Sequence, residues 1–308
     1  MKIVFMGTPD FAVGTLKALY DAGHDIAAVF TQPDKPQGRK MILTASPVKD
    51  LATSLGIPVH QPATLRDGTA LGILSEISPE LIVVVAYGKI LPEEILALPK
   101  YGCMNVHGSL LPKYRGASPI QWSIVCGEKE TGVTTMFMDK GMDTGDILET
   151  ASCPINDEDN SLTLFDRLAV MGAELAVKTV EKIENGTAVP KKQDESLVSY
   201  APMIKKEMGM LDFTLPAVRV VDLVRGLYGW PGAYFMLDGA KIKVHAAKTA
   251  EGRKAPAGTV LCSKEKLIIA CGDGNAVELT EVQPEGKGRM SARDMLNGRP
   301  IKENSVIG

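Results

Sequence analysis

Short apolar runs alternate with amphipathic stretches along the first part of the chain. Runs at residues 2–6, 25–31 and 81–86 predict strands, and the last of them, LIVVVA, contains no polar position. Such uninterrupted apolar strands are typical of a parallel sheet that is covered on both faces. Between the runs, apolar residues recur at helical spacing, which predicts helices over residues 11–22 and from Pro47 to about residue 56.

The same alternation continues as far as residue 188. Further strands are expected at 58–60 and 104–106 and as a pair at 133–138 and 147–155. A long amphipathic helix is expected over residues 162–185, closed by a glycine. Strands that alternate with helices in this way predict a Rossmann-like α/β fold, with a mostly parallel sheet and helices on both faces.

The pattern changes after the polar stretch KKQDESLVSYAPMIKKE. A helix is expected over residues 217–227 and a terminal one over 291–296. Five short strands separated by turn residues are expected near 233–237, 241–247, 258–262, 267–271 and 276–282. They are typical of a small β-barrel of the oligonucleotide-binding type. We therefore predict an α/β domain of residues 1–188, a linker of residues 189–206 and a C-terminal β-barrel of residues 207–308.

Composition narrows the class of protein. The chain has 308 residues, of which 45% are apolar and 23% charged, as in ordinary globular proteins. The apolar run at the N-terminus is too short for a signal peptide, and no 18 consecutive residues are apolar, so we expect a cytoplasmic protein without a membrane partner. The five cysteines contain no C-x-x-C pair, so neither a disulfide framework nor a metal site is indicated. We expect a monomer.

Polar residues gather where the predicted strands end. The segment NVHGSLLP begins at Asn105, KYRG follows it, and DKGMDTGD spans residues 139–146. Binding sites in open α/β sheets lie beyond the carboxyl ends of the strands, so these segments and residues 87–89 are where a ligand is expected. Residues at positions i and i+2 of a strand point to the same side, so Asn105 and His107 can reach one atom together.

These segments resemble the folate-dependent formyltransferases. The patterns N-x-H-G-S-L-L-P-x-x-R-G and D-x-G-x-D-T-G-D are both present. The resemblance implies that 10-formyltetrahydrofolate is the formyl donor, that an amine is the acceptor, and that Asn105, His107 and Asp143 are catalytic. Among the three aspartates of the second segment only the resemblance selects Asp143, because Asp139 and Asp146 compete with it for the same role.

The residue types suit this chemistry. When an amine attacks a formyl group, negative charge develops on the formyl oxygen. One preorganised hydrogen-bond donor at such an oxygen typically lowers the barrier by about 3 kcal/mol. Asn105 and His107 could supply these donors. Asp143 could orient His107, favour its protonated form and help move the proton that the amine loses.

The resemblance also assigns the donor pocket. It implies that Ser109, Leu110, Leu111 and Pro112 line the folate site and that backbone groups of Tyr87 and Gly88 contact the pterin. Taken alone, the S-L-L-P segment is only an apolar loop. The first strand is followed by GTPDFAVG instead of G-x-G-x-x-G, which disfavours a nicotinamide enzyme.

The acceptor is indicated outside the catalytic motif. The segments IVFMGTPDFAV and RGLYGWPGAY resemble the members of this family that act on methionyl initiator tRNA. The resemblance implies that the basic insertion at residues 34–45 enters the acceptor-stem region, with Arg39 and Lys40 as phosphate contacts. Lys205 and Lys206 at the start of the C-terminal part are expected to make further phosphate contacts. Two alternatives stay open, a formyltransferase that acts on a nucleotide-sugar amine and a tRNA-binding protein that has lost catalysis.

Overall fold

The computed structural model describes residues 1–37 and 41–307. It forms two compact units. Unit 1 consists of Met1–Pro119, Glu130–Cys153 and Phe165–Ala201, and unit 2 consists of Ile120–Lys129, Pro154–Leu164 and Pro202–Gly308. Arg39 and Lys40, two of the expected tRNA contacts, lie outside the described residues. No helix within residues 1–37 and 41–307 has the length and apolar character to cross a membrane.

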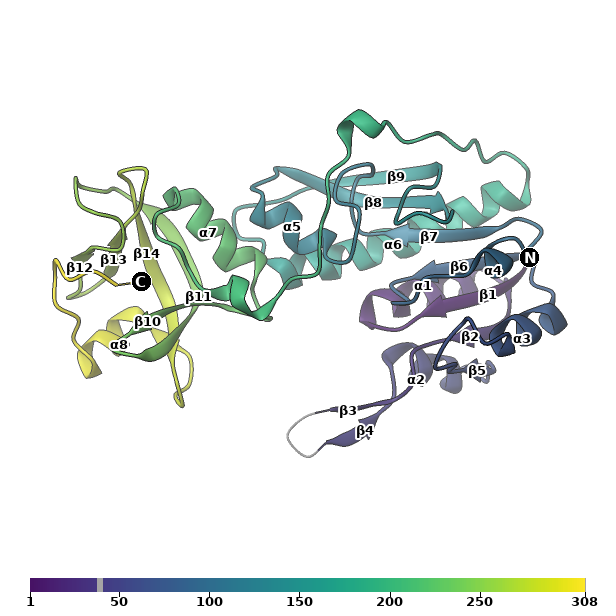
Figure 1. Cartoon of the computed structure of the whole chain (residues 1–308), viewed down its shortest axis with the longest axis horizontal. Helices are drawn as coiled ribbons and strands as arrows, with labels where there is room; N and C mark the ends of the chain where they lie inside the picture. Colours follow the sequence, from purple (N-terminus) through teal and green to yellow (C-terminus); the bar gives the residue numbers. More distant parts are fainter. Residues whose placement is uncertain (38–40, 308) are drawn as a thin grey trace. The chain divides into compact units, whose positions relative to one another are not determined.

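Unit 1 is built on a seven-stranded sheet in the order β5-β2-β1-β6-β7-β8-β9 (Figure 1). The strands are β1 (Lys2–Gly7), β2 (Asp25–Phe30), β5 (Val59–His60), β6 (Leu81–Val85), β7 (Cys103–His107), β8 (Glu130–Phe137) and β9 (Ile147–Pro154). The first five pair in parallel, whereas β8 is antiparallel to β7. The predicted, mostly parallel sheet is confirmed.

Helices cover both faces of this sheet, as the uninterrupted apolar strands predict. On one face, Met6 and Ile82 share a core cluster with Leu74 of α3 (Thr69–Ile77) and Ile95 of α4 (Glu93–Leu96). The other face meets α1 (Asp10–Asp21) and α6 (Ser161–Glu184), where Gly172 packs closely against Val106. Alternation along β7 therefore places Val106 toward α6 and its neighbours in sequence on the α3 face.

Local sequence accounts for where α2 (Pro47–Ser54) begins. The hydroxyl of Ser46 accepts a hydrogen bond of 3.1 Å from the backbone N–H of Lys49, and proline occupies the first helical position. Ser46 thus satisfies one of the amide groups that a helix leaves unpaired at its N-terminus, and Pro47 has no such group to satisfy. The predicted start of this helix is confirmed.

The insertion at residues 34–45 contains a hairpin that the hydrophobic pattern does not predict. Strand β3 (Lys35–Gln37) pairs antiparallel with β4 (Ile42–Thr44), with Lys35 opposite Thr44. The side chains of Ile42 and Leu43 are 61% and 66% exposed. A strand without a buried face gives no alternation of apolar and polar residues, which is why this hairpin is absent from the prediction.

Unit 2 contains a curled, barrel-like antiparallel sheet in the order β10-β11-β14-β13-β12, with β15 paired to β14 (Figure 1). Its strands and helices are α5 (Pro119–Val125, from Ile120 on), α7 (Ala217–Gly226), β10 (Ala233–Leu237), β11 (Ala240–Ala250), β12 (Val260–Cys262), β13 (Leu267–Ala270), β14 (Ala276–Pro284), β15 (Met290–Ser291) and α8 (Ala292–Gly298). Val220 of α7, Phe235 of β10 and Leu296 of α8 share one core with the inner face of the sheet. The five predicted strands are confirmed, and the short β15 is added to them.

Candidate active site

Strand β7 positions the first two predicted catalytic residues. Asn105 lies between Val84 of β6 and Met136 of β8, and His107 ends the strand opposite Thr134. Both belong to the face of β7 opposite to Val106, so their side chains leave the sheet on the same side. His107 is only 7% exposed, whereas Asn105 is half-buried. The Asn105 side chain has no hydrogen-bond partner among the residues that the structure describes.

Both ring nitrogens of His107 face oxygen atoms of the protein. Nε2 lies 3.0 Å from the backbone carbonyl oxygen of Tyr114, and Nδ1 lies 3.7 Å from Oδ2 of Asp143. The ring therefore lies between a backbone carbonyl oxygen and a carboxylate oxygen, and these two contacts fix its orientation.

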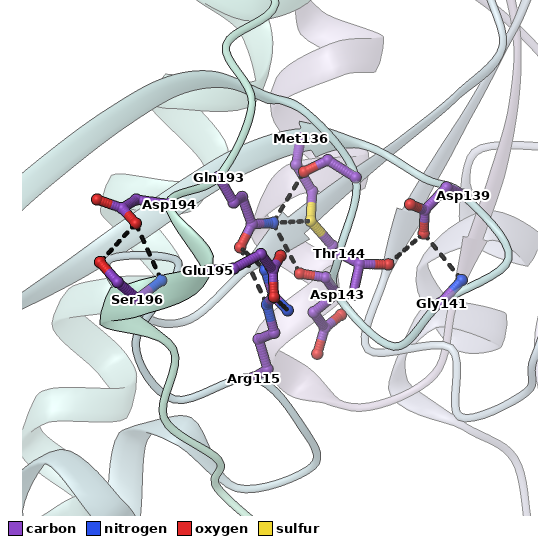
Figure 2. A network of polar contacts seen from close by, with 11 residues as sticks. Arg115, Met136, Asp139, Gly141, Asp143, Thr144, Gln193, Asp194, Glu195 and Ser196 are labelled. Carbon is purple, nitrogen blue, oxygen red and sulfur yellow. Dashed lines mark hydrogen bonds and ion pairs between the residues drawn. The ribbon is translucent and has the colours of Figure 1, made fainter.

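Asp143 is the aspartate of its segment that meets His107. Its Oδ2 also accepts a hydrogen bond of 2.8 Å from the backbone N–H of Gly116. Asp139 is exposed and makes hydrogen bonds only within its own loop in the described structure. Its Oδ1 accepts from the backbone N–H of Gly141 at 2.9 Å and from Oγ1 of Thr144 at 2.5 Å (Figure 2). The geometry thus separates Asp143 from Asp139, which spacing in the sequence alone does not do.

The predicted folate segment forms a tightly bonded loop after β7. Ser109 is fully buried, and its hydroxyl donates a hydrogen bond of 2.7 Å to the carbonyl of Lys113. Oγ1 of Thr134 donates to the Ser109 carbonyl at 2.7 Å and accepts from the backbone N–H of Leu111 at 3.1 Å. The Leu111-Pro112 peptide bond is cis. The Ser109 hydroxyl is thus already used within the loop.

The other predicted folate residues, Leu110, Pro112 and Gly88, differ in exposure. The side chains of Leu110 and Pro112 are half-buried, so both keep some accessible surface. Gly88 has a positive φ of 79°, a conformation that glycine adopts without strain.

Tyr87 connects the ends of three neighbouring strands. Its carbonyl, just beyond β6, accepts hydrogen bonds of 3.1 Å from Oγ1 of Thr8 beyond β1 and from Nε2 of Gln32 beyond β2. Its side chain is 1% exposed, and burial raises the pKa of Tyr87 to about 12. Thr8 and Gln32 were not predicted as site residues. Their position beyond strand ends was the signal that could have indicated them.

Two residues of the predicted linker, Gln193 and Glu195, were also missed, and both bind Arg115 of the KYRG segment. Gln193 accepts hydrogen bonds through Oε1 from Nε and Nη2 of Arg115, at 3.0 and 2.8 Å (Figure 2). Its Nε2 donates to the carbonyls of Asp143 and Gly145, both at 2.8 Å. Arg115, which is 2% exposed, also pairs with Glu195 at 2.8 Å. The hydrogen bond from Arg115 holds the pKa of the Glu195 carboxyl below its usual range.

Backbone pairing attaches the same segment to the motif. The N–H of Arg115 donates to the carbonyl of Ser199 at 2.9 Å, and its carbonyl accepts from the N–H of Ala201 at 2.7 Å. Residues 193–201 therefore belong to unit 1. Lys205 and Lys206, the remaining predicted tRNA contacts, are exposed residues of unit 2, with Lys206 opening the short 3-10 helix η2 (Lys206–Gly209).

The comparison with known families decides the assignment. The family model described as formyl transferase matches residues 1–180, and the model described as formyl transferase, C-terminal domain, matches residues 203–300. The chain belongs to the formyltransferase family. This formyltransferase therefore has the two-part organisation of its family, and it is an enzyme that transfers a formyl group.

Similar proteins cover the chain from end to end. The methionyl-tRNA formyltransferase of Caldanaerobacter subterraneus subsp. tengcongensis is 51% identical over 310 residues, which cover 100% of both chains. The protein of the same name from Geotalea uraniireducens is 47% identical over 100% of this formyltransferase and 98% of the relative.

Solved structures share the fold at low sequence identity. The N-formyltransferase from Helicobacter canadensis, in complex with folinic acid and dTDP-3-aminofucose, has a TM-score of 0.70 and 20% identity over 92% of this chain and 99% of that chain. HypX from Aquifex aeolicus, in complex with tetrahydrofolic acid, has a TM-score of 0.60 and 17% identity over 100% of this chain and 50% of that chain. At these identities the similarity concerns the fold alone.

Proposed function

We propose that this formyltransferase transfers the formyl group of 10-formyltetrahydrofolate to the α-amino group of methionyl initiator tRNA. The observation that carries the acceptor assignment is 51% identity, over the whole length of both chains, with a protein named methionyl-tRNA formyltransferase. The donor assignment is supported by the N-x-H-G-S-L-L-P motif and by structures of similar fold that are described with folinic or tetrahydrofolic acid.

The proposed reaction begins when the methionyl amine attacks the formyl carbon, and charge develops on the formyl oxygen. The Asn105 amide is free to donate a hydrogen bond to this oxygen, since its side chain has no partner among the described residues. His107 can also donate a hydrogen bond to the formyl oxygen through Nε2. This bond would replace the contact of Nε2 with the Tyr114 carbonyl or be shared with it. Hydrogen bonds from both groups to this oxygen would stabilise the negative charge of the tetrahedral intermediate.

Asp143 supports this step through its charge. Its carboxylate lies 3.7 Å from Nδ1 of His107, so its negative charge faces the ring and keeps that ring oriented. We propose that Asp143 also accepts, directly or through water, the proton that the amine loses on attack. When the bond from the formyl carbon to N10 of the folate breaks, N10 takes up the proton that Asp143 has accepted, directly or through water, and the products are tetrahydrofolate and formylmethionyl-tRNA.

RNA binding is assigned to the two regions that lie outside the catalytic motif. We propose that residues 207–308 form the tRNA-binding domain, with Lys205 and Lys206 next to it as phosphate contacts. The insertion at residues 34–45, with Arg39 and Lys40, is proposed to contact the acceptor stem. The exposed hairpin of β3 and β4 supports this, because an exposed insertion is accessible to a large partner such as tRNA.

One assay with three acceptors tests the proposal. The purified chain is incubated with 10-formyltetrahydrofolate and methionyl initiator tRNA, free methionine or a nucleotide-linked amino sugar, and formylated product is quantified. Formylation of methionyl-tRNA alone is the expected result. Formylation of the amino sugar in the absence of RNA would overturn the acceptor assignment, and binding of tRNA without any transfer would overturn the catalytic one.

A further inference from the structure

The backbone that carries Asp143 has an unusual conformation. Its φ is 55°, in the left-handed region that only a few per cent of residues other than glycine adopt. A residue in this region stays there when its surroundings hold it. The position of the Asp143 carboxylate relative to His107 therefore depends on what fixes the turn at residues 143–145.

Gln193 holds this turn from the side. Its Nε2 donates to the carbonyls of Asp143 and Gly145, one on each side of Thr144, so a single amide group closes the turn (Figure 2). These carbonyls lie inside an irregular segment, where regular secondary structure supplies no partner for them. Gln193 thus supplies hydrogen bonds that the turn cannot supply itself.

Arg115 fixes the orientation of that amide. Oε1 of Gln193 accepts from Nε and Nη2 of Arg115, whose guanidinium is held in turn by Glu195. If the amide were rotated by half a turn, its NH2 group would face the guanidinium and its oxygen would face the two carbonyls. Every contact would then be repulsive, so the observed orientation is the one that the network permits.

The same arginine is adjacent to the other restraint on Asp143. The backbone N–H of Gly116, the next residue after Arg115, donates to Oδ2 of Asp143 at 2.8 Å. The network thus holds Asp143 at its backbone through Gln193 and at its carboxylate through Gly116. We propose that Gln193 is a positioning residue for Asp143, oriented by Arg115. This inference rests on the catalytic role proposed for Asp143.

The variant Gln193→Glu tests the proposal with little change of shape. It keeps an acceptor for Arg115 and replaces the NH2 donor by a carboxylate oxygen that faces two carbonyls. We expect kcat for formyl transfer to fall by about 10- to 100-fold, the loss that a small misplacement of a catalytic group can cause, while KM for tRNA and for the folate is unchanged. Asp194→Asn is the matched control. Asp194 accepts hydrogen bonds only from Ser196 among the contacts in Figure 2, and its replacement should leave kcat unchanged.

A double-mutant cycle separates positioning from a general loss of structure. In an Asp143→Asn background, Gln193→Glu should cause no further fall in kcat, because the group that it positions has already been disabled. Independent, multiplicative losses in the double variant would overturn the inference, and so would a wild-type kcat in Gln193→Glu. A wild-type kcat in Asp143→Asn alone would instead overturn the proposed role of Asp143.

A second variant covers the case in which Gln193→Glu does not fold. Gln193→Asn keeps the amide but is one methylene shorter, so it cannot reach Arg115 and both carbonyls together. It should show the same fall in kcat and the same lack of additivity with Asp143→Asn. A kcat equal to that of the wild type in this folded variant would overturn the inference equally.

Discussion

Oδ2 of Asp143 lies 3.7 Å from Nδ1 of His107, although the two residues are 36 positions apart in the chain. The carboxylate reaches the ring from a turn between β8 and β9, while the ring belongs to the end of β7. This contact is the feature that separates Asp143 from the other aspartates of its segment.

Replacing Asp143 should therefore affect catalysis far more than replacing Asp139. In Asp143→Asn the side chain keeps its size but loses its charge, and we expect kcat to fall by roughly 10²- to 10⁴-fold, the range of general acid-base contributions. Asp139→Asn is the control, because Asp139 bonds only within its own exposed loop in the described structure. Steady-state formylation assays measure both. If the Asp139 variant lost as much activity as the Asp143 variant, the assignment would be wrong.

Gly145 should tolerate no side chain. A Cβ at this position would lie 1.7 Å from the carbonyl oxygen of Phe137, so the turn would have to move. We expect Gly145→Ala to lower the free energy of unfolding by about 1–3 kcal/mol, as overpacking does, and to lower kcat as well. Urea denaturation and the formylation assay check the two effects.

Gly72 provides the control for this substitution. It lies inside α3 with no atom within 4 Å of a Cβ, so Gly72→Ala should raise the free energy of unfolding by about 0.5–1 kcal/mol and leave kcat unchanged. If both variants were equally stable, the close packing around Gly145 would not have the predicted effect.

The strands and long helices could be predicted from the sequence because each has a buried face. Thus β6 was recognised from LIVVVA and α6 from its periodicity. The helix α3 was missed because the residue before it, Gly68, offers no side-chain cap, in contrast to Ser46 at the start of α2. The hairpin β3–β4 was missed because its apolar residues Ile42 and Leu43 are exposed.

The candidate site was predictable where residues are close in sequence. Asn105 and His107 share one strand, so their common side follows from geometry. In contrast, Gln193 is 78 residues from Arg115, and no local pattern states that these two will meet. The polar composition around Gln193 suggested a linker, whereas its side chain is half-buried against the catalytic motif.

The pH dependence of stability should reveal the buried His24. Burial is the main cause that lowers the pKa of His24 from 6.5; the N-terminal ammonium of Met1 also lowers it, while Glu184 and Glu181 raise it. A lowered pKa means that the unfolded chain binds the proton more readily. The contribution of His24 to stability is therefore complete above pH 6.5 and is lost as the pH falls through the lowered value.

The variant His24→Gln isolates this effect. Urea denaturation at several pH values on both sides of 6.5 should show a smaller acid loss of unfolding free energy in the variant than in the wild type. The carboxyl of Glu184 does not titrate in the pH range where His24 takes up its proton, since a hydrogen bond from the N-terminus holds the pKa of Glu184 below 4.5. If the free energy of unfolding changed with pH in the same way in both proteins above pH 4.5, His24 would not titrate as described.

Lys205 and Lys206 should contribute to RNA binding through charge. In the double variant Lys205→Ala, Lys206→Ala, the affinity for tRNA should fall, and the slope of log affinity against log salt concentration should become shallower by roughly 1 to 2. The exposed Lys264, to which no tRNA contact is assigned, is the control. Filter binding over a range of salt measures the slopes. An unchanged slope in the double variant would remove these two lysines from the proposed contacts.

We propose that the residues at the end of β7 stabilise the intermediate of formyl transfer to methionyl-tRNA. The most direct test of this proposal is the single-turnover rate of formyl transfer by His107→Ala, with the thermal midpoint and the folate affinity measured in parallel. We expect a rate about 10²- to 10³-fold below that of the wild type, with a folded protein that still binds folate. A folded variant that transfers the formyl group at the rate of the wild type would contradict it.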